Sequence, residues 1–597
     1  MVTPSPAGQP VREVADPGGG DERVCWGLTL AYGVPNLAGA AMLVPILIHM
    51  PKFYADVVVV PLGYLAIAIA VARALDALSD PLIGWMSDRT RTRWGRRRPY
   101  MAIGAPLCAL TFWALFSPPA GLSTDGAALW FGITFVLYFF FHTIYALPHY
   151  ALGAELTLDY HERSRLFGVR EGCTILGTIA ASVAPGVLVD GLGFDERQAF
   201  SILGGLIAIL LVGLYWLLVA VVRERAEFAA RAANPFVPGV RRALRNRPFR
   251  ILLSTYVVGS VAGAIPGTLM PFFNSYVIRP DNEARWLAIF LAAYFASGFV
   301  CLPIWVLVAR RVGKRPAWLA SFVMGITGGG AMFFLGQGDT ILLLVLIAWA
   351  GSSFGAGLFL GPAMQADVID YDELHTGKRR EAQYSAFWAM LPKFVAIPSA
   401  AIPIAILGSI GYVPNAIQSP QVVLAIRAIF ALTPALFSTL AFFIAWRFAI
   451  DEGAHRAILN GIARHRRGEA ATDPLTGQVL PPPLAHSVDD DTGWFLDHFS
   501  RRELTRVLQR GRRGIVRDVW LAAAGAMSVC TAAVLVVINR VTTLEAEPGP
   551  VSVLAIVVSG FALALFLFHL MRLRSARELA AGAVSDEAVR AHLRRYR

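Results

Sequence analysis

Three charged residues, Arg73, Asp76 and Asp80, lie inside an apolar stretch of the chain. Their spacing of three and four residues places all three on one face of a helix. Charged groups at membrane depth are costly, and proteins keep them where they face a bundle interior or an aqueous cavity. Two carboxylates one turn apart offer hard oxygen ligands for Na⁺, or a proton-carrying group. The pattern predicts a cation site. The alternative, a structural ion pair of Arg73 with one aspartate, leaves the other carboxylate unexplained.

A second charged group, Lys393, lies alone in a later apolar run. A single ammonium at that depth needs a carboxylate partner. We therefore predict a charge network of Asp76, Asp80 and Lys393, joined by Arg73. The alternative is a lysine near a helix end whose side chain reaches up to the membrane surface.

The composition around these residues is that of a polytopic membrane protein. Of 597 residues, 56% are hydrophobic and 16% are charged, against about 25% charged in average soluble domains. The net charge of +12 comes with arginine clusters between apolar runs, so the positive-inside rule explains it better than nucleic-acid binding. The five cysteines are scattered and form no metal or disulfide spacing. We expect no cofactor, no nucleic-acid partner, and no metal beyond a possible Na⁺ at Asp76 and Asp80.

Apolar runs of roughly 20 residues each predict membrane-spanning helices. Fourteen such runs occur, at about 25–50, 57–86, 100–117, 127–153, 167–191, 199–222, 251–278, 286–309, 317–336, 341–365, 384–410, 423–446, 519–540 and 551–571. The predicted fold class is an all-α integral membrane protein. An even number of spans puts both termini on one side, and the arginine-rich loops such as 87–99 make that side cytoplasmic. The N-terminal tail, 1–24, lacks the pattern of a signal peptide.

A short repeat divides the spans into two sets of six. Arg93-Trp-Gly-Arg-Arg-Arg-Pro99 follows the second span, and Arg311-Val-Gly-Lys-Arg-Pro316 follows the eighth. We predict an N-terminal six-helix bundle over 25–222, a cytoplasmic linker over 223–250 and a C-terminal bundle over 251–446, around a midplane cavity.

The chain beyond residue 446 changes character. Residues 447–518 are predicted to be a cytoplasmic linker, in which 492–510 has apolar residues at helical spacing among basic ones, suited to the membrane surface. An extra transmembrane hairpin over 519–571 has no ionisable residue at its centre, so we expect it to be peripheral to the transport path. A basic cytoplasmic tail, 572–597, follows. We expect contact with membrane lipid or a partner here, and no further function is evident.

The stretch Asp76-Ala-Leu-Ser-Asp80-Pro-Leu-Ile-Gly-Trp85, followed by Thr90-Arg-Thr-Arg-Trp-Gly-Arg-Arg-Arg-Pro99, resembles the second helix and loop of the melibiose permease group. These are the glycoside–pentoside–hexuronide:cation symporters of the major facilitator superfamily. The resemblance implies the fold of that superfamily and a coupling-cation site at the two aspartates. Ser79 replaces an asparagine of the family, which leaves Na⁺ and H⁺ both open.

The same resemblance implies further site residues. It adds Thr143 to the cation site and sets Lys393 opposite the aspartates. It implies a substrate cavity that includes Ala40, Ala146, Tyr150, Arg170, Glu171 and Trp388. Arg170 has an alternative as half of a structural pair with Glu155 or Glu162. The family's sugar-binding aspartates fall on Ala40 and Ala146, and its tryptophan platform on Tyr150, so a typical galactoside is not the expected substrate.

Basic and acidic turns at the cytoplasmic side resemble the family's gate. Its members here would be Arg96, Arg97, Arg98, Asp367 and Asp370, with solvated helix ends as the alternative. The sequence shows no nucleotide loop or nucleophile constellation, so we expect no enzyme. We predict a cation-coupled symporter of a sugar, glycoside or related small solute, monomeric, in a plasma or bacterial inner membrane. The alternatives are a transporter of a lysolipid-like amphipathic substrate and a non-transporting sensor or scaffold.

Overall fold

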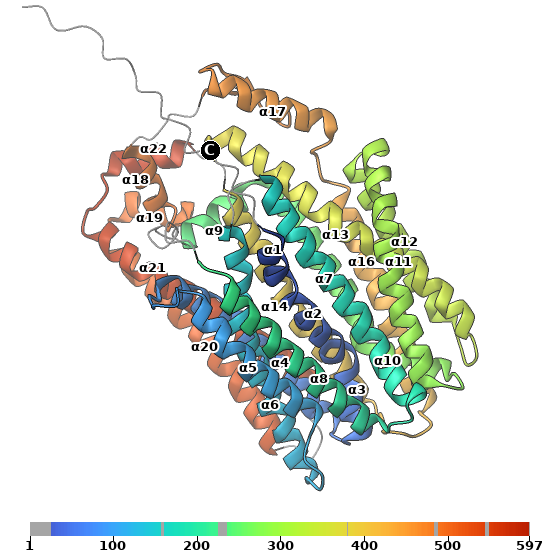
Figure 1. Cartoon of the computed structure of the whole chain (residues 1–597). Coiled ribbons are helices and arrows are strands. Elements are labelled where there is room, and N and C mark those ends of the chain that lie inside the picture. Colours follow the sequence, from blue (N-terminus) through green and yellow to red (C-terminus); the bar gives the residue numbers. More distant parts are fainter. Residues whose placement is uncertain are drawn as a thin grey trace, which may run out of the picture.

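The computed structural model describes residues 25–156, 160–224, 236–378, 380–482, 488–543 and 549–595. These residues form a bundle of long helices with a group of shorter helices at one end (Figure 1). Within the described ranges the only sheet is a two-stranded antiparallel one, β1 (Ala471–Thr472) with β2 (Val479–Leu480). The prediction of an all-helical membrane protein is confirmed.

The first half begins with a span that is broken into short pieces. Its elements are α1 (Trp26–Gly33), α2 (Pro35–Val44), the π-helical η1 (Pro45–His49), α3 (Met50–Lys52) and η2 (Phe53–Val57). The other spans of this half are α4 (Leu62–Arg89), α5 (Arg98–Phe116), α6 (Thr124–Leu156), α7 (Tyr160–Gly186) with η3 (Val187–Gly191), and α8 (Glu196–Val221). A short helix, α9 (Phe236–Arg245), lies in the linker between the halves.

The second half repeats this plan. Its spans are α10 (Arg247–Phe273) with η5 (Asn274–Ile278), α11 (Glu283–Val312), α12 (Lys314–Ala331) with η6 (Met332–Phe334), α13 (Thr340–Thr376), α14 (Glu381–Ser409), and α15 (Pro420–Arg427) with η7 (Ala428–Leu432) and α16 (Thr433–Ala445). The C-terminal part adds α17 (Glu452–Arg466), α18 (Val488–Leu496), α19 (Arg501–Arg510), α20 (Gly514–Thr543), α21 (Pro550–Ala580) and α22 (Asp586–Arg595).

Thirteen helices in the described ranges are long and apolar enough to cross a membrane. They correspond to the predicted spans except the eleventh. That span is α14, which has 29 residues and in which Lys393–Ser409 is a shorter apolar helical stretch.

The two predicted turns of the repeat share a glycine with a positive φ. Gly95 and Gly313 both have a positive φ, +104° and +92°, a conformation that glycine adopts without strain. In the first turn the carboxylate of Glu224 accepts hydrogen bonds from the backbone N–H groups of Arg96, Arg97 and Arg98. Glu224 therefore ties the end of α8 to the start of α5, and a side chain on Gly95 would occupy the carboxylate's position.

Helices α9, α17, α18, α19 and α22 gather at one end of the bundle, the upper end in Figure 1. The start of α1 lies toward the same end. Residues of α18, α19, α22 and the adjoining ends of α20 and α21 form a separate hydrophobic core that includes Leu496, Phe499, Leu504 and Leu579. We call the cluster formed by α18, α19, α22 and the adjoining ends of α20 and α21 the cap.

Candidate functional site

The two aspartates of α4 and the lysine of α14 meet in the bundle. The Nζ atom of Lys393 lies 2.6 Å from Asp80 Oδ2 and 3.4 Å from Asp76 Oδ1. The Asp76 side chain is 3% exposed and that of Asp80 is 16% exposed. Asp76 and Asp80 are one turn apart, so both carboxylates point toward the same facing helix.

A hydroxyl group from α6 completes the cluster. Thr143 Oγ1 lies 2.9 Å from Asp76 Oδ1 and 3.1 Å from Asp80 Oδ1. Its single proton is donated to one carboxylate at a time. Ser79 is directed elsewhere, because its hydroxyl donates to the backbone carbonyl of Asp76 at 3.0 Å. The cluster of Asp76, Asp80, Thr143 and Lys393 thus draws on three helices and both halves of the bundle.

Arg73, which was predicted to join this network, lies against the aromatic ring of Phe139. Its guanidinium lies 4.2 Å from the ring centroid of Phe139 on α6. Of the described residues, none forms an ion pair with Arg73. The side chain is on the predicted helix face, but a long guanidinium can reach an aromatic ring on the neighbouring helix. The two carboxylates therefore contact one ammonium directly, and the Arg73 guanidinium adds a second positive charge that interacts with Asp76 through space.

Trp388 and Arg170 make aromatic contacts on opposite halves. The indole of Trp388 stacks on the ring of Tyr256 from α10, with centroids 3.8 Å apart and planes inclined by 10°. The guanidinium of Arg170 lies 4.8 Å from the Phe167 ring and 5.4 Å from the Tyr150 ring.

The partner of Arg170 is its chain neighbour. Arg170 Nε donates to Glu171 Oε1 at 3.1 Å. Glu162 pairs with Arg165 at 2.6 Å, and the side chain of Glu155 is outside the described residues. Ala40 and Ala146 are both buried, at 8% and 6% exposure. Their roles in a substrate cavity stay predictions.

The residues of the predicted cytoplasmic gate have the following contacts with described residues. Arg96, Arg97 and Arg98 bind Glu224 through their backbone amides, as described above. Asp367 accepts from Lys314 Nζ at 2.7 Å, and Asp370 lies 3.0 Å from His455 Nε2 on α17. A latch between the basic and acidic sets stays a prediction.

The opposite end of the bundle holds a contact between the halves that the sequence did not indicate. Asp56 in η2 is 5% exposed and accepts hydrogen bonds from Tyr276 at 2.8 Å and from Tyr412. Lys52 lies 2.9 Å from the same carboxylate, and the Asn415 amide donates to the Asp56 carbonyl at 2.7 Å. We call these five residues the outer latch. An aspartate inside the apolar sequence Phe53–Val60 was the available signal.

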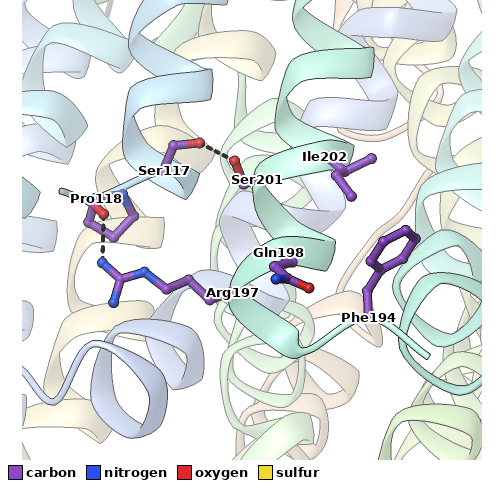
Figure 2. Close-up of a pocket in the computed structure, with 7 residues that line it drawn as sticks. All are labelled: Ser117, Pro118, Phe194, Arg197, Gln198, Ser201 and Ile202. Carbon is purple, nitrogen blue, oxygen red and sulfur yellow. Dashed lines mark hydrogen bonds between the residues drawn. The ribbon is translucent and has the colours of Figure 1, made fainter. Parts of the chain in front are cut away.

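A surface hollow of about 420 Å³ lies away from the charged cluster, between the ends of α5 and α8 (Figure 2). Arg197 points across it and donates to the carbonyl of Pro118 at 2.6 Å, and the Ser117 and Ser201 hydroxyls bond to each other at 2.7 Å. These contacts use polar groups that a ligand would need, so the hollow is not a candidate substrate site.

Comparison with known proteins identifies relatives of most of the chain. Residues 31–452 match the profile of a family described as MFS/sugar transport protein. The inner membrane symporter YicJ of Escherichia coli is 26% identical over 70% of this chain and 90% of its own length. The glucuronide carrier protein homolog of E. coli is 24% identical over 75% and 97%. The isoprimeverose transporter of Lactiplantibacillus pentosus is 24% identical over 79% and 97%.

Solved structures show the same fold. A mutant of the nucleoside transporter NupG superposes with a TM-score of 0.51 at 14% identity, covering 71% of this chain and all of that one. A bacterial homolog of the human lysosomal transporter Spinster, inward-facing and unoccupied, gives 0.52 at 13% identity, covering 73% and 97%. The predicted major facilitator fold is confirmed.

Proposed function

Because this chain belongs to the MFS/sugar transport protein family, we propose that it is a cation-coupled symporter of a sugar, glycoside or related small solute that works by alternating access. The chain is a multi-pass membrane protein and not an enzyme. The observation that supports coupling is the cluster of Asp76, Asp80, Thr143 and Lys393, which joins an anionic helix of one half to a cationic helix of the other.

The cluster offers a physical route from cation binding to conformational change. A ligand shifts an equilibrium between two states only when it binds them differently. In this structure Lys393 occupies the oxygens that a cation would use, and it also connects α4 to α14. A cation that binds the two carboxylates displaces the ammonium and removes this connection between the halves. Cation binding therefore favours a different arrangement of α4 and α14.

The outer latch supplies the second condition for alternating access, which is a closed side. Asp56 belongs to the first half, whereas Tyr276, Tyr412 and Asn415 belong to the second. The contacts among them hold the halves together at the end opposite the cap. We propose that this end faces outward and that the arginine-rich end, with both termini, is cytoplasmic.

The stacked pair of Trp388 and Tyr256 supports a substrate with an apolar ring face, since a pyranose presents C–H groups that pack on aromatic rings. The two buried alanines at positions 40 and 146 provide no polar partner for a hydroxyl, which argues against a typical galactoside. The names of two relatives, an isoprimeverose transporter and a glucuronide carrier homolog, agree with a glycoside or sugar acid.

A thermal-stability assay on purified protein tests the cation site before the substrate is known. A cation that binds the folded state at one hundred times its dissociation constant adds about 2.7 kcal/mol of stability. We expect NaCl to raise Tm relative to choline chloride at equal ionic strength if the ion is Na⁺. A Tm that depends on pH and not on NaCl indicates H⁺. Asp76→Asn removes either response, whereas Asp125→Asn, an exposed aspartate at the start of α6, retains it.

The same assay then screens substrates. Sugars, glycosides, sugar acids and lysolipids are added with and without the coupling ion, and we expect a stabilising glycoside whose effect grows when the ion is present. Gradient-driven uptake of that compound into proteoliposomes should disappear in Asp76→Asn. Unchanged concentrative uptake in this variant would refute the proposed cation site, and stabilisation by lysolipids alone would replace the substrate class.

A further inference from the structure

The C-terminal hairpin contacts the transporter at the charged cluster. Helix α21 packs against both α4 and α14. A methyl group on Gly560 would lie 3.3 Å from the Cβ atom of Ala74, and the Phe561 ring packs on Phe394 with centroids 5.3 Å apart. Ala74 is two residues before Asp76, and Phe394 follows Lys393. The hairpin therefore touches the backbone that carries each side of the ion pair.

Helix α21 is buried more deeply against the bundle than a peripheral hairpin would be. Its Val553, Ile556 and Val557 belong to the main hydrophobic core of the bundle. A small residue at Gly560 lets the α21 and α4 backbones approach closely, as small residues do between membrane helices. Only α20, whose apolar surface is largely exposed, has the character of a peripheral helix. Because α4 and α14 belong to different halves, α21 bridges the seam between them.

A second set of contacts joins the cap to α9, the helix in the linker between the halves. Asp497 is fully buried and forms ion pairs with Arg242 and with Arg245 of α9, the latter at 2.7 Å. The Arg242 guanidinium also lies 4.0 Å from the ring centroid of Trp494 on α18. Arg241, the preceding residue of α9, lies 3.7 Å from Glu503 of α19. Through Arg241, Arg242 and Arg245, the short helix α9 is docked onto the cap.

Arg572 joins the two contact surfaces into one unit. This residue near the end of α21 is 1% exposed. Its Nη2 donates to Glu503 at 2.6 Å and its Nε donates to the His498 carbonyl at 2.7 Å. A buried guanidinium with these partners resists displacement, since removing either side leaves a buried charge unpaired. A movement of the cap is thereby transmitted to α21.

We propose that residues 488–543 and 549–595 form an intramolecular strap that restrains the relative movement of the two halves and stabilises the arrangement in which the outer latch is closed. The strap is anchored at the linker by the cap and at the seam by α21. Release of the cap from α9 loosens both anchors and raises the population of the outward-open arrangement. This inference rests on the alternating access proposed above, and it assigns a role to a segment beyond the family match, which ends at residue 452.

Distance measurements between spin labels test the strap in the full-length protein. The native cysteines, Cys25, Cys108, Cys173, Cys301 and Cys530, are free and are replaced by serine. Labels are placed at Leu122 and Phe334, which are exposed at the outer ends of the first and second halves. Double electron–electron resonance then reports whether the outer side is closed or open.

Two variants release the strap at different places. Arg242→Glu/Arg245→Glu opposes Asp497 with like charge, and Gly560→Leu forces α21 away from Ala74. In each we expect the longer outer distance to rise roughly threefold or more in population over the wild type. Arg501→Glu/Arg502→Glu is the matched control, because it makes the same charge change at two exposed arginines of the cap.

The outcomes separate the strap from the proposed function. Distance distributions in both release variants that match the wild type would overturn the strap, and so would an equal response of the Arg501→Glu/Arg502→Glu control. Asp56→Asn, which breaks the outer latch, serves as the internal standard for an open outer side. If that variant also leaves the distance unchanged, alternating access is contradicted together with the strap.

Discussion

At the scale of single residues, the cation cluster depends on one hydroxyl that two carboxylates share. Thr143 is 2% exposed and lies within hydrogen-bond distance of both Asp76 and Asp80. An isosteric apolar side chain would leave both carboxylates without this donor and remove an oxygen ligand for a cation. Because α6 contributes the hydroxyl and α4 the carboxylates, Thr143 also fixes the orientation of the pair.

We predict that Thr143→Val weakens the binding of the coupling cation by about tenfold or more, since a hydrogen bond to a charged group contributes about 1.5–3 kcal/mol. Titration of Tm against cation concentration measures the change. Thr143→Ser retains the hydroxyl and should bind within a factor of about two of the wild type. Equal weakening in the two variants would show that the methyl group, and not the hydroxyl, matters.

A second prediction concerns the outer latch. Leu287 of α11 lines a small polar cleft between the halves at this end and is 8% exposed. A cysteine there reacts with a membrane-impermeant maleimide only when the outer side opens. Asp56→Asn replaces an anionic acceptor by a neutral amide, and charge-assisted hydrogen bonds are about twice as strong as neutral ones. We expect labelling of Leu287→Cys to become several-fold faster. Asp125→Asn, at the exposed start of α6, should leave the rate unchanged, and a rate in Asp56→Asn equal to that of the wild type argues against the latch.

The two clusters show why one site could be predicted and the other could not. Asp76, Asp80 and Lys393 are ionisable groups at membrane depth, where few partners exist, so charge balance together with the family resemblance indicated that they meet. The partners of Asp56 are tyrosines at the ends of spans, and tyrosine is common at membrane interfaces for other reasons. Only the tertiary arrangement brings Tyr276 and Tyr412 to this aspartate.

At the scale of elements, the repeated turn offers a comparison within one chain. Gly95 and Gly313 both have a positive φ, but their surroundings differ. A Cβ atom on Gly95 would lie 2.5 Å from a Glu224 oxygen, whereas one on Gly313 would meet only Pro316 at 3.7 Å. An alanine at either position would be strained by the positive φ. Only an alanine at Gly95 would also disrupt the contact with Glu224.

We therefore predict that Gly95→Ala lowers the free energy of unfolding more than Gly313→Ala. Left-handed backbone strain costs each about 1–2 kcal/mol, and displacement of Glu224 from three backbone amides adds to the first. Thermal unfolding of the two variants side by side measures the difference. In a Glu224→Ala background, a cost of Gly95→Ala that falls to the cost of Gly313→Ala would support the steric cause. Equal destabilisation by both glycine substitutions would contradict it.

The elements themselves were largely predictable, and their breaks and contacts were not. Apolar runs of bilayer length fixed the location of the spans, and the arginine clusters fixed their grouping. The sequence did not indicate that the first span is interrupted by two π-helical pieces, η1 and η2. It also did not indicate that α21 lies against α4 and α14. The apolar surface of α21 can face lipid or protein equally well, because lipid tails are as apolar as a neighbouring helix.

At the scale of the whole molecule, the cap and the transporter bundle are joined by buried ion pairs whose pH response can be worked out. Burial of Asp497 alone would raise its pKa, but hydrogen bonding from His592 and the charges of Arg242 and Arg245 outweigh it and lower the pKa to about 2. A carboxyl whose pKa is lower in the folded state contributes stability above its unfolded value, about 3.9. That contribution is lost as the pH falls from about 4 toward 2.

The docking of the cap should therefore be independent of pH between about 5 and 8, where Asp497 stays ionised in both states. Hydrogen exchange of the α22 amides, corrected for the intrinsic pH dependence, measures docking, since α22 is held through His592 at 3.3 Å from Asp497. We expect flat protection across this range in the wild type and reduced protection in Asp497→Asn. His592→Gln keeps a donor that does not titrate and serves as the control. Protection that rises as the pH falls from 8 to 5 in the wild type and not in His592→Gln would show that the imidazole makes the strap a pH sensor, since a protonated His592 pairs more strongly with the Asp497 carboxylate. Flat protection assigns any pH dependence of transport in that range to groups outside the cap contact, with the carboxylates of α4 as the first candidates.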